Sequence, residues 1–377
     1  MIETDIVVGS GLKATVGRAE LGERLGVVAR AVSTRSAVQV LLGVLLRAEA
    51  GRLHLAATDM ELSLRASADA DVADEGAVVV PGRLLLDIVR QLPEGEVAIE
   101  HRPEEGIVRL ECGTATYRVH TYAAEDFPRL PEVETIPTHT VDRVALLDTV
   151  ARVSRSASRD ESRPVLTGIL VRFEAGKLVM AATDSYRLAV KETAIEGADL
   201  ELEAIVPARA LQELARIASD GDTIELGAHE NQIAFHTGDT WLTTRRIDGQ
   251  FPNYRQLLPE TFEFEVPLAR AEVLEVVRRV SVMVQRNSPL RLRFEEGTLT
   301  VSARTQDVGE AEESLPVQFP GTEPLEIGFN AEFLREGIES MAAEEITLHL
   351  ISPLRPAVIE GGDEDPTYLV MPIRLAG

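Results

Sequence analysis

The sequence predicts an α+β protein made of three similar segments, each with two helices packed on antiparallel sheets. Two observations predict this: a hairpin pattern recurs along the chain, and helical patterns recur before and after it. Dividing 377 residues by three gives about 126 per segment, which is enough for a domain and too long for a solenoid repeat of ~20–50 residues. The expected domains are residues 1–134, 135–261 and 262–377.

The hairpin pattern is clearest in two copies. Residues 43–58 and 168–183 both alternate apolar and polar side chains around an Ala-Gly pair, and both lead into Asp after Ala-Ala-Thr. A weaker third copy runs from Leu290 to Val301 around Gly297. Period-two alternation on both sides of a glycine turn is typical of a β-hairpin.

Two helical patterns accompany each hairpin. The opening pattern, Leu-x-x-Val-x-Arg, ends at Arg30, Arg152 and Arg279. The second begins after Val-Pro at Pro81 and Pro207, and after Phe-Asn at residue 330. Proline in the first turn and a polar residue before it are signals for a helix start.

The second helices separate apolar residues from arginines at 100° per residue. After Pro81, the apolar side comprises Leu85, Ile88, Val89 and Leu92, and Arg83 and Arg90 lie opposite. After Pro207, the apolar side comprises Leu211, Leu214, Ala215 and Ala218, whereas Arg209 and Arg216 lie outside with Glu213 between them.

Composition excludes several classes of protein. A hydrophobic content of 45% supports a core, and the longest apolar run, residues 37–46, is too short for the ~18–20 residues of a membrane span. Met1 to Asp5 lack a signal-peptide pattern, and Cys112 is the single cysteine. We therefore expect a cytoplasmic protein without disulfides or membrane contact.

No reaction centre is evident. The histidines are scattered, and no nucleophile, phosphate-loop or zinc pattern occurs. The duplicated Thr-Asp at 58–59 and 183–184 follows a strand in each copy, which favours a turn role over acid–base catalysis. We expect a non-enzyme with no catalytic residues, metal or cofactor.

The arginines on the predicted helices can be interpreted in two ways. A net charge of −24 disfavours general adhesion to DNA or membranes. Arginines on helices can form solvated ion pairs such as Arg83–Asp87, or together form a surface for phosphates that is independent of base sequence. In the third segment Glu332 and Glu339 replace the arginines of the second helix and leave Arg335, so we expect that helix to contribute little to phosphate binding.

Several longer stretches together resemble one family. They are Pro164–Gly168, Ala182–Val190, Ile247–Pro259, Ile327–Asn330 and Tyr368–Leu375. Over essentially its whole length the sequence resembles the bacterial β sliding clamp, the processivity subunit of DNA polymerase III. The resemblance implies a DNA-clamp fold and a head-to-tail homodimer, a ring of six similar domains with duplex DNA in its hole.

The resemblance also implies partners and site residues. The partners would be the polymerase III α subunit, the clamp loader and other proteins with clamp-binding motifs. The DNA-facing residues expected from the helix patterns are Arg30, Arg83, Arg90, Arg152, Arg209, Arg216 and Arg279, and the resemblance adds Arg35 and Arg159.

A peptide-binding pocket between the second and third domains is implied in the same way. Its wall would comprise Leu166, Thr183, Ser185, Arg187, Leu188, Pro252, Leu257, Leu354, Val370, Met371, Pro372 and Arg374. Apolar side chains would receive the peptide, and polar groups would hold its ends. The chain departs from many relatives at Gln256 and at Ser185–Tyr186, which could change the preferred peptides.

Two alternatives remain at this point. One is a clamp paralogue that serves repair or resists a clamp-directed inhibitor. The other is a repeat-built interaction scaffold without a DNA role. For the dimer, we expect edge strands near Tyr117 and Val119 of one copy to meet the third segment near Val282 of the other.

Overall fold

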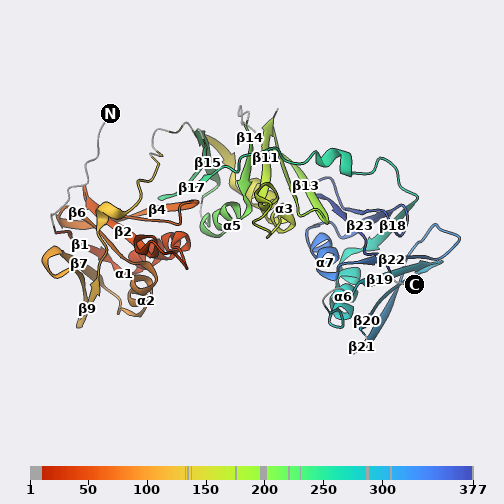
Figure 1. Cartoon of the computed structure of the whole chain (residues 1–377), viewed down its shortest axis with the longest axis horizontal. Coiled ribbons are helices and arrows are strands. Elements are labelled where there is room, and N and C mark those ends of the chain that lie inside the picture. The colour runs from red at the N-terminus through yellow and green to blue at the C-terminus, as the bar shows by residue number, and fades with distance from the viewer. Residues whose placement is uncertain are drawn as a thin grey trace. The chain divides into compact units, whose positions relative to one another are not determined.

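The computed structural model describes residues 11–131, 133, 136, 138–174, 176–195, 202–219, 221–229, 231–285, 288–305 and 308–375 (Figure 1). These residues form two compact units. Unit 1 contains residues 1–140 and 216–246, and unit 2 contains residues 141–215 and 247–377. The division cuts the second predicted segment, and the boundary at 134/135 lies outside the described residues. The three-domain boundaries therefore stay a prediction.

The order of elements is one β-α-β-β-β pattern repeated six times. In residues 13–120 the first copy is β1 (Lys13–Gly17), α1 (Arg18–Val28), β2 (Gly43–Glu49), β3 (Arg52–Thr58) and β4 (Leu62–Asp69), followed by a short β5 (Asp71–Asp74). The second copy is β6 (Gly76–Pro81), α2 (Gly82–Gln91), β7 (Glu96–Arg102), β8 (Ile107–Cys112) and β9 (Ala115–His120).

Residues 138–245 contain the next two copies. The third is β10 (Thr138–Asp142), α3 (Arg143–Val153), β11 (Gly168–Glu174), β12 (Lys177–Thr183) and β13 (Arg187–Ala194), with the one-turn helix α4 (Pro164–Thr167) before β11. The fourth is β14 (Leu202–Pro207), α5 (Ala208–Ile217), β15 (Thr223–His229), β16 (Gln232–Thr237) and β17 (Thr240–Arg245).

The last two copies lie in residues 264–370. The fifth is β18 (Phe264–Ala269), α6 (Arg270–Ser281), β19 (Leu290–Glu295), β20 (Thr298–Thr305) and β21 (Gly309–Pro316). The sixth is β22 (Leu325–Phe329), α7 (Ala331–Glu339), β23 (Glu345–Leu350), β24 (Ala357–Glu360) and β25 (Thr367–Val370). The α+β fold with two main helices per segment is therefore confirmed.

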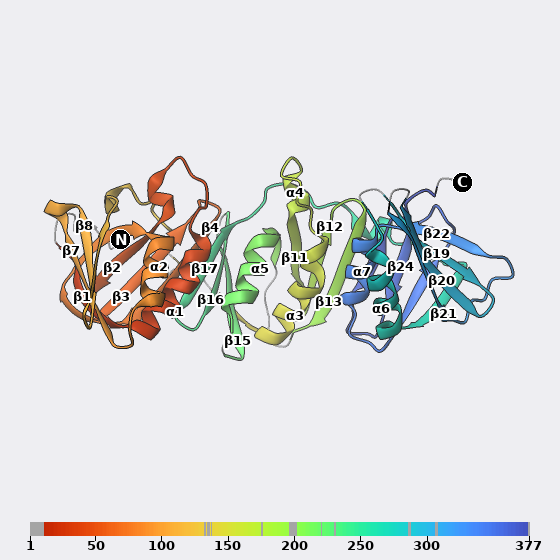
Figure 2. The same ribbon diagram turned by 90° about the horizontal axis from the view of Figure 1, so that it is seen from below.

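Paired copies exchange their first strands. Strand β1 pairs with β7 of the second copy, and β6 pairs with β2 of the first. The same exchange occurs in the other pairs of copies. The four resulting sheets have the strand orders β5-β1-β7-β8-β9, β10-β15-β16-β17-β4-β3-β2-β6, β14-β11-β12-β13-β25-β24-β23-β18 and β21-β20-β19-β22. Helices cover one face of the sheets, with α1 beside α2 and α6 beside α7 (Figure 2).

The fourth strands of the copies join sheets of neighbouring segments. In unit 1, β4 pairs antiparallel with β17, from Leu62 opposite Thr244 to Ala66 opposite Thr240. In unit 2, β13 pairs with β25, and Arg187 lies opposite Val370. Each joint sets the start of one fourth strand against the end of the other. The two remaining fourth strands, β9 and β21, each end a sheet.

The predicted hairpins and helix faces are largely confirmed. Gly51, Gly176 and Gly297 have φ near +76 to +78° in the three hairpin turns, a conformation that favours glycine. On α2 the predicted apolar residues are buried and both arginines are exposed. The prediction is wrong for two residues of α5: Ala215 is exposed and Glu213 is buried. The buried face of α5 is centred nearer Leu214 and extends towards Ala210.

Linkers between the segments pack against the sheets instead of crossing solvent. Val133 and Ile136 are buried with Ala234 of β16, and Trp241 of β17 packs on them. In unit 2, Phe251, Leu258 and Phe262 pack against a cluster that contains side chains of both β13 and β25. Each linker therefore covers apolar surface beside the strand joint that it accompanies.

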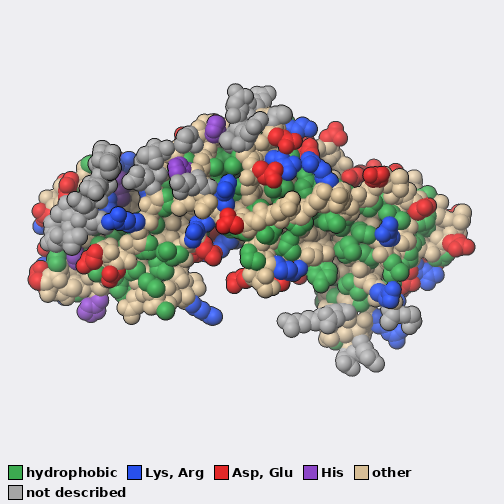
Figure 3. Space-filling view, turned by 45° about the horizontal axis from the view of Figure 1, so that its top comes forward, with side chains coloured by type: hydrophobic (Ala, Val, Ile, Leu, Met, Phe, Trp, Pro, Cys, Tyr) green, Lys and Arg blue, Asp and Glu red, His purple; other side chains and the backbone are tan. Residues whose placement is uncertain are grey.

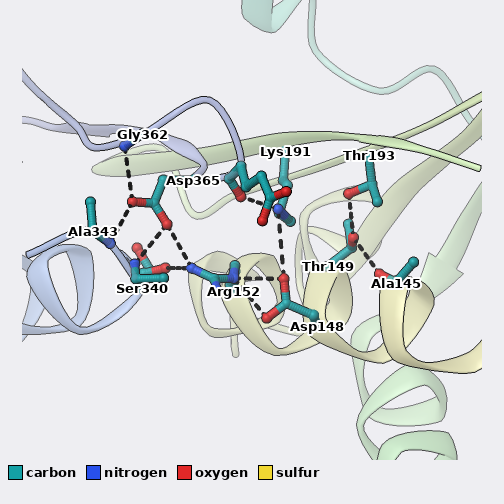
Figure 4. A network of polar contacts seen from close by, with 12 residues as sticks. Ala145, Asp148, Thr149, Arg152, Lys191, Thr193, Ser340, Ala343, Gly362 and Asp365 are labelled. Carbon is teal, nitrogen blue, oxygen red and sulfur yellow. Dashed lines mark hydrogen bonds and ion pairs between the residues drawn. The ribbon is translucent and has the colours of Figure 1, made fainter.

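A buried carboxylate stabilises the joint in unit 2 (Figure 4). Asp365, whose side chain is 2% exposed, lies in the turn between β24 and β25. It accepts hydrogen bonds from the backbone N–H groups of Ala342, Ala343 and Gly362 at 2.6, 3.0 and 3.2 Å. Arg152 of α3 donates to it at 2.8 Å. In unit 1, Asp239 of the β16–β17 turn similarly pairs with Arg24 and Arg52 at 3.3 and 2.9 Å.

We expect Asp365→Asn to lower the free energy of unfolding by about 2–3 kcal/mol at pH 7, because it leaves Arg152 and backbone donors without their anion. Burial opposes ionisation of Asp365, but its backbone donors and Arg152 outweigh it and hold the pKa below the usual value. A lowered pKa stabilises the fold above about pH 4, and this contribution is lost as the pH falls below that.

Urea unfolding between pH 3 and 7 measures this effect. The matched control is Asp363→Asn, which changes an exposed carboxylate in the same turn. Equal unfolding free energies for the two variants at pH 7 would show that Asp365 does not hold the joint.

Candidate functional site

The two arginines of α2 are exposed on one face of the helix, as binding to a phosphate requires. Arg83 and Arg90 are exposed on the side opposite buried Leu85 and Val89. No described residue forms an ion pair with either guanidinium. Arg35, in the loop that follows α1, is also exposed and unpaired within the described residues. These three side chains of unit 1 keep their positive charge available to a ligand.

Other predicted arginines are exposed and have protein partners. Arg30 lies in the 3₁₀ turn η1 (Ala29–Ala31), directly after α1, and Arg209 and Arg216 lie on α5. All three are exposed, and each has an interaction within the chain. Arg159 is exposed in the loop after α3, and no described residue pairs with it.

Two of the predicted arginines form ion pairs within the chain. The side chain of Arg152 is 18% exposed and is bonded to Asp148, Asp365 and the carbonyl of Ser340. Arg279 is exposed, but it forms two hydrogen bonds to Glu313, at 2.6 and 3.0 Å, and one to Glu275. Arg152 therefore holds segments together, and the charge of Arg279 is neutralised where it lies.

Sequence reasoning left other basic side chains out of the site. Arg155, Arg278 and Arg335 all approach the carboxylate of Glu339, from η5 (Ser154–Ser156), α6 and α7. A helical pattern running on past Arg152 was the available signal for Arg155. On the face drawn in Figure 3, basic side chains lie among acidic ones, which agrees with local basic sites on an acidic protein.

The Thr-Asp turn between β12 and β13 is built by side-chain hydrogen bonds. Thr183 donates its hydroxyl to the carbonyl of Arg187 at 2.6 Å and accepts from the N–H of Ser185. Asp184 accepts from the N–H groups of Tyr186 and Arg187 at 2.9 and 3.0 Å. Ser185 consequently has φ +80°. This confirms a structural role for Thr-Asp and leaves Ser185 and Tyr186 exposed.

The C-terminal segment is fixed beside this turn. The N–H of Met371 donates to the carbonyl of Tyr186 at 2.8 Å, and that of Ile373 donates to Gly328 of β22 at 2.7 Å. A Cβ atom at Gly328 would lie 2.5 Å from the side chain of Leu375. Glycine thus permits the tail to lie against β22, and Met371 is presented next to Tyr186.

Arg187 is engaged with partners inside the protein. It is buried, hydrogen-bonded to Asp184 and Glu336, and its guanidinium lies 4.3 Å from the ring centroid of Phe333. Tyr368 interacts with the Arg187 guanidinium, and burial raises the pKa of its hydroxyl to about 12. We therefore assign Arg187 to positioning the turn against α7.

The other predicted pocket residues divide by exposure. Thr183, Leu188 and Val370 are buried, as Arg187 is. The exposed or partly exposed residues are Leu166, Ser185, Pro252, Leu257, Leu354, Met371, Pro372 and Arg374. Tyr186, which the sequence marked as a departure from relatives, is 61% exposed. Sequence reasoning missed Arg163, which donates to Ser185 at 3.1 Å.

Two negative findings concern the described residues only. Their histidine, cysteine and acidic side chains form no group of three that could hold a metal ion. None of their helices has the length and apolar character that a membrane crossing requires.

Comparisons with known proteins agree along the whole chain. Family models of the DNA polymerase III beta subunit match residues 12–131 (N-terminal domain), 140–253 (central domain) and 255–374 (C-terminal domain). The beta sliding clamp of Streptomyces coelicolor is 35% identical over 381 residues, with 97% of this chain and 100% of that protein covered. The beta sliding clamp of Synechococcus elongatus is 36% identical over 376 residues, with the same shares covered.

Solved structures show the same likeness. The sliding clamp of Caulobacter crescentus gives a TM-score of 0.89 at 30% identity, covering 97% of this chain and 100% of that one. The clamp of Bacillus subtilis gives 0.91 at 23% identity, with 97% and 100% covered, which supports the fold alone. The chain therefore belongs to the DNA polymerase III beta subunit family, the bacterial beta sliding clamps.

Proposed function

We propose that this sliding clamp works as a head-to-tail homodimer that encircles duplex DNA. As a DNA polymerase III beta subunit, the chain is a non-catalytic processivity factor. A ring holds DNA by topology, so weak contacts to phosphates are sufficient, and tight base-specific contacts would slow sliding. We infer that it acts in the cytoplasm on the replicating chromosome.

The observation that carries the dimer proposal is the pair of unused fourth strands. Four of the six fourth strands pair with each other, β4 with β17 and β13 with β25. The same joint between two copies would set the end of β9 against the start of β21. Charge favours this pair, because β9 carries exposed Arg118 whereas β21 carries exposed Glu310 and Glu312.

Exposed arginines support the DNA contact. We propose that Arg35, Arg83, Arg90 and Arg159 meet the sugar–phosphate backbone, joined by Arg30, Arg209 and Arg216. These side chains come from the helices, or the loops that follow them, in the predicted first and second segments. Because the chain carries a net charge of −24, most of its surface repels DNA and limits non-specific adhesion. DNA binding is therefore confined to these exposed arginines.

The partner site that we propose is the exposed surface around the Thr-Asp turn. Leu257, Leu354 and Met371 are 50, 58 and 39% exposed, which is unusual for large apolar side chains, and Tyr186 adds an exposed aromatic ring. Such a surface suits the short apolar motifs of the polymerase α subunit, the clamp loader and other clamp-binding proteins. The alternatives, a paralogue or a scaffold without a DNA role, are not favoured by the relatives.

Topological tethering is tested by loading the clamp onto nicked circular DNA and then cutting the circle. The complex should survive gel filtration while the DNA is circular and should dissociate once an unblocked end is created. A clamp that remains bound to the linear product would be held by affinity, and the ring proposal would be wrong.

For the dimer, we expect Arg118→Glu to raise the dissociation constant about tenfold or more, because it sets a carboxylate against acidic β21. Sedimentation over a range of concentrations measures the change. Arg129→Glu makes the same change in charge at an exposed linker position and should dimerise like the unaltered chain. Equal behaviour of the two variants would rule out β9 as the joint.

For the partner site, Leu354→Ala and Met371→Ala should each weaken binding of a clamp-binding peptide about tenfold, the loss expected for an apolar anchor of about 1.4 kcal/mol. Val144→Ala, at an exposed position of α3, is the control. Fluorescence anisotropy of a labelled peptide measures binding. If all three variants bind equally well, the peptide docks elsewhere.

A further inference from the structure

Three arginines converge on one carboxylate in unit 2. Glu339, the last residue of α7, lies 2.8 Å from Arg155 and 2.8 Å from Arg278, measured between nitrogen and oxygen atoms. Arg335, one helical turn earlier, approaches the same carboxylate at 3.8 Å. Arg155 follows α3 in the predicted second segment, whereas the other residues belong to the third. We call Arg155, Arg278 and Arg335 the arginine cluster.

The arginine cluster faces solvent above the carboxylate. The side chains of Arg155, Arg278 and Arg335 are 55, 53 and 40% exposed, whereas that of Glu339 is 21% exposed. Three guanidinium groups and one carboxylate leave a formal charge of +2 at this place. Arg187 lies nearby and pairs with the carboxylates of Asp184 and Glu336, but this guanidinium is buried.

Glu339 holds these cations in place as an anion. Burial opposes its ionisation, but hydrogen bonds from Arg278 and Arg155 and the charge of Arg335 outweigh burial and hold its pKa below the usual value. A carboxylate is planar and accepts paired N–H groups of arginine in the way that a phosphate does. A ligand phosphate would therefore find guanidinium groups already gathered.

We propose that the arginine cluster binds a backbone phosphate of duplex DNA and that Glu339 occupies the place of that phosphate when DNA is absent. This inference rests on the proposed function and adds a contact in the third segment, where sequence analysis expected little. Glu339 is a positioning residue that also weakens binding, since a phosphate must compete with it. Weak, replaceable contacts are what a clamp needs to move along DNA.

Duplex DNA is favoured over an acidic peptide by the elements that carry the cluster. Arg155 comes from η5, the turn after α3, and Arg278 comes from α6. Helices α1, α3 and α6 each open a segment, and the proposed DNA contacts Arg30 and Arg159 lie in the turn or loop that follows such a helix. The exposed apolar surface proposed for peptides centres on the Thr-Asp turn and the C-terminal tail.

The test measures binding of the full-length dimer to a short linear duplex by fluorescence anisotropy from 20 to 200 mM salt. Glu339→Gln removes the competing charge and frees the arginines, so affinity at low salt should rise about three- to tenfold. The slope of log K against log salt should steepen by about 0.9, the value for one additional phosphate contact. Arg278→Gln should lower affinity and make the slope shallower.

Glu332→Gln is the matched control, because it makes the same charge change at an exposed position of the same helix. It should change affinity less than twofold and leave the slope unaltered, and thermal unfolding checks that all variants are folded. Equal results for Glu339→Gln and Glu332→Gln would overturn the inference and leave the proposed function standing. If a polyglutamate peptide of matched charge displaces the duplex as well as unlabelled duplex does, the cluster binds acidic protein instead. If no variant binds duplex at any salt concentration, this inference is wrong, whereas the proposed ring is still decided by the loading test on circular DNA.

Discussion

Main-chain hydrogen bonding at the edges of sheets is the constraint on which the rest of this structure depends. An edge strand presents unpaired N–H and C=O groups, and a stable protein must cover or pair them. Here the fourth strand of a βαβββ copy is paired with the fourth strand of another, as β4 with β17 and β13 with β25. One chain can satisfy only four of six such strands. The remaining pair, β9 and β21, is what makes a second copy necessary in our account.

The joints within the chain have stabilising features that the proposed joint between copies lacks. Asp239 and Asp365 lie in the turns that precede β17 and β25. Asp239 is held by two arginines of the preceding segment and Asp365 by one. Linkers add apolar contacts beside both joints. The equivalent turn before β9, Gly113–Thr114, contains no carboxylate, and no linker connects two separate chains. In the proposed ring, we therefore expect the joint between copies to be the weakest and to be the place where a clamp loader would open it.

Sequence periodicity predicted most of the fold, because helix faces and hairpins depend on local patterns. The hairpin glycines, the buried face of α2 and the cap at Asn330, whose side chain accepts from the N–H groups of Glu332 and Phe333, are all local features. The fate of individual arginines was not predictable, because it depends on partners far away in the sequence. Arg152 faces Asp365, 213 positions later, and Arg155 faces Glu339. The resemblance likewise gave Arg187 as a pocket residue, whereas its partner Glu336 on α7 draws it into the interior.

Hydrogen exchange of backbone amides at several protein concentrations tests the shared joint most directly. The amides of β9 and β21 should be protected at concentrations where the dimer forms and should exchange rapidly on dilution, whereas those of β4, β17, β13 and β25 should stay protected throughout. Exchange in β9 and β21 that does not depend on protein concentration would contradict the account, since the two strands would then not be completing each other's sheets.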